Sequence, residues 1–168
     1  MTLDRLNAAD RETFVNAIGF AFENSPWIAE AAWEHRPFAS LAVLHSSMVS
    51  LVTAASSERQ IALIVAHPDL AGHLARAGWL TSASATEQDH AGLDQLTADE
   101  LVHFDRLNSA YHTRFGFPFV ICARENNKAS IIAALEERLT NDREAESAMA
   151  LAEIAKIARL RLAGAITA

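Results

Sequence analysis

One histidine, His67, ends an apolar run and stands directly before a proline in the sequence IVAHPDLAG (residues 64–72). Histidine is the side chain that titrates nearest to neutral pH without help, so His67 is a candidate general acid or base. The alternative is structural, because a histidine at a helix end can bond to a backbone carbonyl. The position of His67 alone leaves both roles open. Pro68 is the next residue and would lie beside the same site.

A second polar group lies in SASATEQDHAGL (residues 82–93). Ser84 and Glu87 have the spacing of a capping box, which predicts that Ser84 caps a helix and that Glu87 bonds back to it. A helix start also offers free N–H groups to a ligand. Glu87 and Gln88 would then supply an acceptor beside a mixed donor and acceptor, a pair that suits a ureido or amide group.

Three aromatic residues surround a glycine and a proline in FGFPFVIC (residues 115–122). Residues 117–122, which follow Gly116, have no helical periodicity and are expected to be extended. Phe117 and Phe119 could simply fill the core between two helices. The functional alternative uses the backbone, because an extended segment between helices carries unpaired N–H and C=O groups. The main chain of Phe119, Val120 and Ile121 could then bind the amide edge of a flat heterocycle.

Two arginines close the sequence IAKIARLRL (residues 154–162). Arg159 and Arg161 are two residues apart, so on a helix they lie on different faces. Both could be solvated near a helix end. An arginine directed inward would instead form a planar clamp for carboxylate or imide oxygens.

Metal and thiol chemistry are disfavoured by the sequence. The histidines form no H-E-x-x-H pair and no Cys/His set, so no metal site is predicted; those considered are His67, His73, His90, His103 and His112. Cys122 lies in an apolar run and is expected in the core. It is the single cysteine, which excludes an intramolecular disulfide.

These candidates require helices to position them. Apolar residues recur at helical spacing in several segments, and Thr97 and Glu100 have the spacing of a capping box. Asn127 is predicted to cap a helix that runs through Ile131 and Leu139. The other predicted helices cover residues 13–23, 27–33, 40–56, 57–66, 98–115 and 144–162. The sequence therefore predicts an all-α, single-domain bundle of about seven or eight helices over residues 1–168.

Composition narrows the function further. The 168 residues are 51% apolar, ample for a core, and the net charge is −7 without a basic tract. Nucleic-acid binding is therefore not expected, because phosphate attraction dominates such affinity. The sequence contains no long apolar region, so neither a signal peptide nor a membrane span is expected. We expect a cytoplasmic protein that makes no membrane contact.

The motifs taken together, in their order, resemble the 2-oxo-4-hydroxy-4-carboxy-5-ureidoimidazoline (OHCU) decarboxylases, which act in urate breakdown and yield (S)-allantoin. The resemblance covers nearly the whole chain. It rests on FENSPWIAEAAWEHRPF (22–38), AHPDLAG (66–72), SASATEQDHAGL (82–93), LNSAYHTRFGFPFVICARENN (107–127) and EIAKIARLRL (153–162).

The resemblance implies an all-helical homodimer that acts on a small ureidoimidazoline without metal or organic cofactor. It assigns His67 and Glu87 to catalysis. It implies substrate contacts for Pro68, Ser84, Gln88, Phe117, Phe119, Val120, Ile121 and Arg161, with Trp27 as pocket wall. Two other functions remain: a helical module that binds a ureide or related heterocycle without catalysis, and a purely structural bundle.

Overall fold

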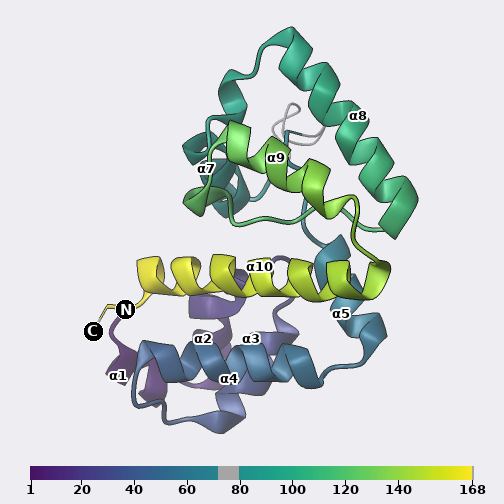
Figure 1. Cartoon of the computed structure of the whole chain (residues 1–168). Helices are drawn as coiled ribbons and strands as arrows, with labels where there is room; N and C mark the ends of the chain where they lie inside the picture. The colour runs from purple at the N-terminus through teal and green to yellow at the C-terminus, as the bar shows by residue number, and fades with distance from the viewer. Residues whose placement is uncertain (72–79, 168) are drawn as a thin grey trace. The chain divides into compact units, whose positions relative to one another are not determined.

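The structure is a computed structural model and describes residues 1–71 and 80–167. Within these residues the regular structure is helical, apart from a parallel bridge between Thr2 and Thr167, so the predicted all-α class is confirmed (Figure 1). The α-helices are α1 (Leu3–Ala8), α2 (Arg11–Ile18), α3 (Trp27–Ala32), α4 (Leu41–Ala54), α5 (Ser57–Val65), α7 (Ser82–His90), α8 (Ala98–Phe115), α9 (Lys128–Arg138) and α10 (Arg143–Ala165). The 3₁₀ turns are η1 (Gly19–Ala21), η2 (Trp33–His35), η3 (Leu93–Gln95) and η4 (Ala123–Glu125).

The chain divides into two compact units. The first joins Met1–Ala66 to the end of the chain from Ala155, and the second is His67–Ile154. Helix α10 supplies residues to both. The single domain predicted over residues 1–168 therefore stays a prediction.

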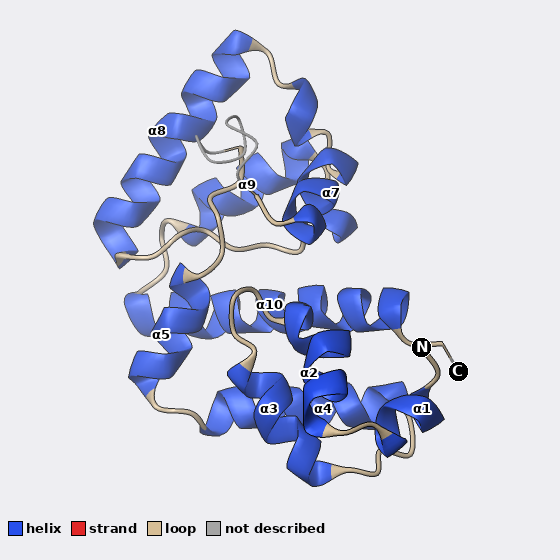
Figure 2. Ribbon diagram, turned by 180° about the vertical axis from the view of Figure 1, so that it is seen from behind, coloured by secondary structure: helices blue, strands red, loops and turns tan. Residues whose placement is uncertain are grey.

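Side-chain caps start helices α2 and α4 of the first unit. Asp10 accepts the N–H of Thr13 at 2.8 Å at the start of α2, and Ser40 caps α4. Such caps satisfy N–H groups that a helix start leaves without a carbonyl. Helix α3 then packs against both α2 and α4 (Figure 2). Their buried residues Phe14, Ile28 and Leu44 form part of the core.

The two chain ends meet in the first unit. The N-terminal ammonium of Met1 donates to the carbonyl of Ala165 at 3.1 Å. The N–H of Thr167 donates to the carbonyl of Met1 at 2.9 Å. Both views show the N and C labels side by side (Figures 1 and 2).

The helix predicted over residues 13–23 is wrong at its end. Helix α2 stops at Ile18 and continues only as η1, and Phe22 is extended. Burial explains the difference, because the chain turns so that both Phe22 and the carboxylate of Glu23 are buried. In a continuous helix, the side chains of these two consecutive residues would point to different faces.

Helix α8 dominates the second unit and follows its prediction. It begins at Ala98 with the predicted capping box of Thr97 and Glu100 and ends at Phe115. Gly116 then adopts a left-handed φ of 77°, which favours glycine. Asn127 caps α9, also as predicted.

No single helix in the described residues is long and apolar enough to cross a membrane. By length and composition the pair α4 and α5 would pass such a test together, with a bend of 116° between them.

Candidate active site

The residues that follow His67 form a loop fastened by two helices of the second unit. His67 is buried, with 7% of its surface exposed, and Pro68 is half-buried. Gln88 of α7 accepts the N–H of Ala71 at 3.0 Å. From α8, Asn108 donates to the carbonyl of Leu70 at 3.0 Å, and Nε2 of His112 lies 2.8 Å from a carboxylate oxygen of Asp69. The loop therefore has anchors at three consecutive residues.

The last described residue of the anchored loop has an unusual backbone conformation. Ala71 has a φ of +52°, in the left-handed region that a residue with a Cβ rarely adopts. Its N–H is the group that Gln88 holds. Such strain persists where the surroundings fix the backbone, and it is often found at functional sites. His73, considered above as a ligand, lies outside the described residues.

Helix α7 corrects the predicted cap. The N-cap is Thr81, whose hydroxyl accepts the N–H of Ser84 at 3.3 Å. The helix thus begins before Ser84, so Ser84 lies within the first turn and cannot cap it. Ser84, Glu87 and Gln88 are spaced by three and four residues and share one helix face. Ser84 and Gln88 are buried, while Glu87 is half-buried.

The segment predicted to be extended, residues 117–122, lies outside any helix, and Cys122 has extended backbone angles. The aromatic side chains of the segment face a packed core. The ring of Phe119 meets Tyr111 edge-on at 5.4 Å between centroids, and Phe117 lies 6.1 Å from the same ring. The guanidinium of Arg138 lies 4.4 Å from the centre of the Phe119 ring. These side chains therefore fill the core, and the predicted substrate contacts of this segment rest on its main chain.

A buried ion pair supports the extended segment, and the sequence prediction missed it. The carboxylate of Glu146 is fully buried and pairs with Arg138, with Nε donating at 2.8 Å. The hydroxyl of Tyr111 donates to the same carboxylate, and Nδ2 of Asn141 donates to it at 2.8 Å. Burial, followed by the charge and hydrogen bond of Glu146, raises the pKa of Tyr111. Nη1 of Arg138 donates to the carbonyl of Val120 at 2.8 Å.

Three glutamates act on Cys122 at the end of this segment. The N–H of Cys122 donates to Glu153 at 2.9 Å. Burial, with the negative charges of Glu125, Glu153 and Glu87, raises the pKa of the Cys122 thiol to about 11. The thiol therefore stays protonated near neutral pH and is a poor nucleophile, which agrees with the predicted core role. Helix α7 packs on η4, the turn that directly follows Cys122.

Arg161 and Trp27 belong to the first unit. Nη1 of Arg161 lies 2.8 Å from a carboxylate oxygen of Glu23, and both side chains are buried. The same nitrogen donates to the carbonyl of Phe20 at 3.1 Å. Arg161 is thus directed inward, while Arg159 is exposed.

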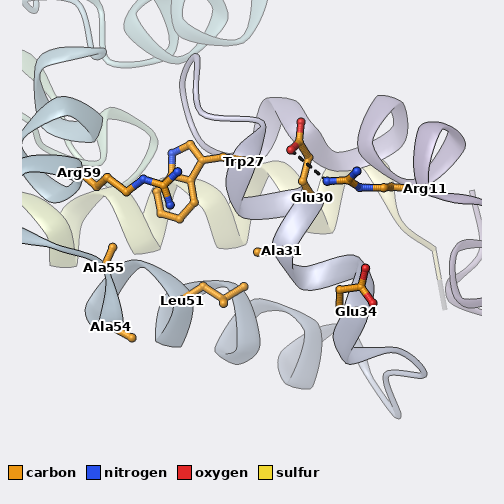
Figure 3. A pocket seen from close by; sticks show the side chains of 9 residues that line it. All are labelled: Arg11, Trp27, Glu30, Ala31, Glu34, Leu51, Ala54, Ala55 and Arg59. Carbon is orange, nitrogen blue, oxygen red and sulfur yellow. Dashed lines mark hydrogen bonds and ion pairs between the residues drawn. The ribbon is translucent and has the colours of Figure 1, made fainter.

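Trp27 borders an open hollow of about 450 Å³ in the first unit (Figure 3). The guanidinium of Arg59 lies over its indole ring, 4.6 Å from the centroid. Arg11 and Glu30 pair at 3.3 Å on another side of the hollow. The hollow is lined by Arg11, Trp27, Glu30, Ala31, Glu34, Leu51, Ala54, Ala55 and Arg59. None of the other predicted site residues is among these.

Within the described ranges, no three His, Cys, Asp or Glu side chains gather as a metal site requires. The expectations that the protein uses neither metal nor cofactor stay predictions.

The geometry can be compared with known proteins. The sequence profile of OHCU decarboxylase matches residues 7–163. The chain belongs to the OHCU decarboxylase family. A family member from Haloferax volcanii, named 2-oxo-4-hydroxy-4-carboxy-5-ureidoimidazoline decarboxylase, is 43% identical over 163 residues, which cover 97% of this chain and 95% of the relative.

Two further similar proteins are longer than this chain. A "Uric acid degradation bifunctional protein" of Bacillus sp. (strain TB-90) is 43% identical, and the match covers 96% of this chain and 32% of that protein. The crystal structure of an (S)-allantoin synthase superposes with a TM-score of 0.81 at 28% identity, covering 99% of this chain and 54% of that one.

Proposed function

We propose that this protein is a carboxy-lyase that converts OHCU to (S)-allantoin in urate degradation. The observation that carries the proposal is the family match along residues 7–163, together with 43% identity to a relative named for this decarboxylation over 97% of the chain. The buried His67, at the start of a loop with three anchors, is consistent with catalysis.

The chemistry needs no external electron sink. In OHCU one ring carbon carries a carboxylate and a hydroxyl, and its neighbour carries the ureido group. Breaking the bond to CO₂ sends an electron pair into the adjacent ring imine, whose nitrogen takes up a proton from solvent or the protein. The neighbouring carbon then takes a proton on one face, while the hydroxyl loses its proton and becomes the ring carbonyl. The protein must position the carboxylate and stabilise the developing charge.

His67 is the proposed acid or base beside the hydroxyl and carboxylate. In that place it would initiate CO₂ loss or deliver the proton that sets the (S) configuration. Glu87 would orient His67 or hold the ureido N–H groups. Pro68 would border the ring next to His67.

Gln88 has a narrower role than its side chain allows. Its Oε1 is engaged by the N–H of Ala71, and its amide nitrogen makes no hydrogen bond within residues 1–71 and 80–167. The amide N–H₂ is therefore the half of the group proposed to reach a ureido carbonyl. Ser84, four residues earlier on the same face, would add a hydroxyl contact.

The extended segment supplies the proposed contacts to the ring. The main chain of Phe119, Val120 and Ile121 would bind its amide edge, while Phe117 and Phe119 keep the segment packed. Arg161 is proposed to hold an anionic or carbonyl oxygen, and Trp27 to form pocket wall. Homodimer formation and a cytoplasmic location belong to the same proposal.

A coupled assay tests the function. Urate is fed through urate oxidase and 5-hydroxyisourate hydrolase, this protein is added, and circular dichroism is followed. OHCU decays slowly by itself to racemic allantoin, which leaves no lasting signal. Rapid growth of a persistent (S)-allantoin signal is the expected result, and a trace equal to the protein-free control contradicts the proposal. Titration with (S)-allantoin then identifies a non-catalytic binding module, which would bind without turnover.

A further inference from the structure

Two buried charged side chains hold the extended segment on either side of Ile121. Arg138 donates from Nη1 to the carbonyl of Val120 at 2.8 Å, and Glu153 accepts the N–H of Cys122 at 2.9 Å. Both side chains come from helices, α9 and α10, and their residues are 7% and 6% exposed. Hydrogen bonds therefore hold the segment at the two peptide groups that flank Ile121.

These two hydrogen bonds determine where the main-chain groups of Ile121 point. Both flanking peptide bonds are trans, and a trans peptide is planar with its C=O and N–H opposed. Directing the Val120 carbonyl toward Arg138 turns the Ile121 N–H away from Arg138. Directing the Cys122 N–H toward Glu153 likewise turns the Ile121 carbonyl away from Glu153.

Ile121 itself is left with two unsatisfied main-chain groups. In the described part of the chain, no hydrogen bond reaches its N–H or its C=O. The residue is only 8% exposed, and buried backbone groups normally find partners. A donor and an acceptor on one residue therefore stand ready for a ligand.

The arginine that grips Val120 is itself immobilised. Its Nε donates to Glu146 at 2.8 Å, and its guanidinium lies on the ring of Phe119. Asn141 and Tyr111 bond to the same carboxylate. Guanidinium geometry permits the carboxylate and the carbonyl to be bonded at once, which a single ammonium cannot do with the same directions.

We propose that Arg138 and Glu153 are positioning residues that direct the N–H and C=O of Ile121 toward the substrate. The complementary ligand is a cyclic urea or amide, which presents a C=O and an N–H side by side on one ring edge. This inference rests on the proposed function, since the imidazoline ring of OHCU has such an edge. Neither side chain touches the reacting atoms.

The variant Arg138→Lys tests the hydrogen bond from Arg138 to the Val120 carbonyl. Lysine keeps the charge opposite Glu146 but cannot also hold the Val120 carbonyl in the same geometry. Loss of one oriented hydrogen bond to the ring raises KM for OHCU about 3- to 10-fold and leaves kcat within about twofold, the pattern of lost uniform binding. Arg143→Lys is the matched control, because Arg143 donates to the carbonyl of Phe115 at 3.2 Å and not to Val120.

Two variants of Glu153 test the hydrogen bond from the Cys122 N–H to its carboxylate. Glu153→Gln keeps an acceptor for the Cys122 N–H, whereas Glu153→Leu removes it. The glutamine variant keeps a KM near that of the wild type, and the leucine variant raises it. In each variant the dissociation constant of (S)-allantoin follows KM. The amide signal of ¹⁵N-labelled Ile121 shifts less on addition of (S)-allantoin in the leucine variant, and as much as in the wild type in the glutamine variant.

The outcomes separate cleanly. The inference is supported when Arg138→Lys raises KM and Arg143→Lys does not, with thermal midpoints that show both folded. An active wild type whose Arg138→Lys and Glu153→Leu variants are folded and keep the wild-type KM overturns the inference alone. Equal effects in Arg143→Lys also overturn it, because the role would then be structural. A wild type without turnover overturns the proposed function together with the inference.

Discussion

The side-chain oxygen of Gln88 holds the N–H of Ala71 at 3.0 Å, at the residue where the loop after His67 takes a left-handed conformation. Gln88, which is predicted to contact substrate, thus also holds in place the loop that carries His67, the candidate acid or base. The two halves of one amide have different neighbours, so their roles can be separated by substitution.

Gln88→Glu and Gln88→Leu make that separation. Glutamate keeps an acceptor for Ala71 but loses the amide donor, and leucine loses both. We expect the glutamate variant to raise KM with a smaller loss of kcat, and the leucine variant to lose kcat as well, because the loop is released. Steady-state kinetics in the coupled assay measure this. Equal kinetics for the two variants would show that the bond to Ala71 has no catalytic consequence.

His67→Ala is expected to fold and to lose about 10²- to 10⁴-fold in kcat, the usual contribution of a positioned acid or base. His90→Ala is the control, because His90 is exposed at the end of α7. Turnover is followed by circular dichroism and folding by thermal unfolding. A folded His67→Ala enzyme with near-normal turnover would remove His67 from the mechanism.

The start of α7 provides a contrast between stability and activity. Thr81→Ala removes the helix cap and is expected to lower the free energy of unfolding by about 1 kcal/mol with turnover unchanged. Ser84→Ala removes no cap, and loss of a substrate hydrogen bond should reduce kcat/KM about 3- to 10-fold. Urea unfolding and kinetics on both variants check this. The reverse pattern would restore Ser84 as the cap.

The buried pair of Arg161 and Glu23 predicts a large stability effect. Glu23→Gln leaves a buried guanidinium without its counter-charge and should cost about 3–5 kcal/mol in unfolding free energy. The double variant Glu23→Leu, Arg161→Met removes both charges and should recover much of that loss. If Arg161 also binds substrate, the double variant is stable but nearly inactive. A stable double variant with full turnover would assign Arg161 to structure alone.

Cys122 predicts a loss of stability at alkaline pH. Its thiol pKa is raised from 9.0 to about 11, so the folded protein holds the proton more tightly than the unfolded chain. Stability is therefore retained below pH 9 and falls as pH rises toward about 11. Urea unfolding from pH 8 to 11 should show a shallower decline for Cys122→Ala. Identical slopes would mean that burial does not shift the thiol. Tyr111, whose pKa is also raised, contributes equally to both proteins above its ordinary pKa of 10.0.

Local signals could be predicted from the sequence, and long-range pairs could not. Thr97 and Glu100 are three residues apart, so their capping box and the limits of α8 follow from adjacent residues alone. At α7 the hydroxyl residues Thr81, Ser82 and Ser84 can each cap a helix, so the sequence alone does not select Thr81, which the structure has as the N-cap. Glu23 is 138 positions from Arg161, and no spacing rule joins them.

One signal was present and not used. Arg138 follows Ile131 and Leu135 on the apolar stripe of α9, and all three are buried. Glu146 and Glu153 likewise share the buried stripe of α10 with Ala150. A charge on an apolar stripe indicates a buried pair or a ligand, since burial of a lone charge is costly.

The meeting of Met1 with Ala165 and Thr167 has a consequence for protein fusions. A second protein joined to either end would emerge from the same point on the first unit. The order of two fused enzymes would then change their separation little. A short peptide joining the ends would also permit new termini elsewhere, as in circular permutation. The Bacillus bifunctional relative, of which this chain covers 32%, shows that sequences of this family do occur within longer polypeptides.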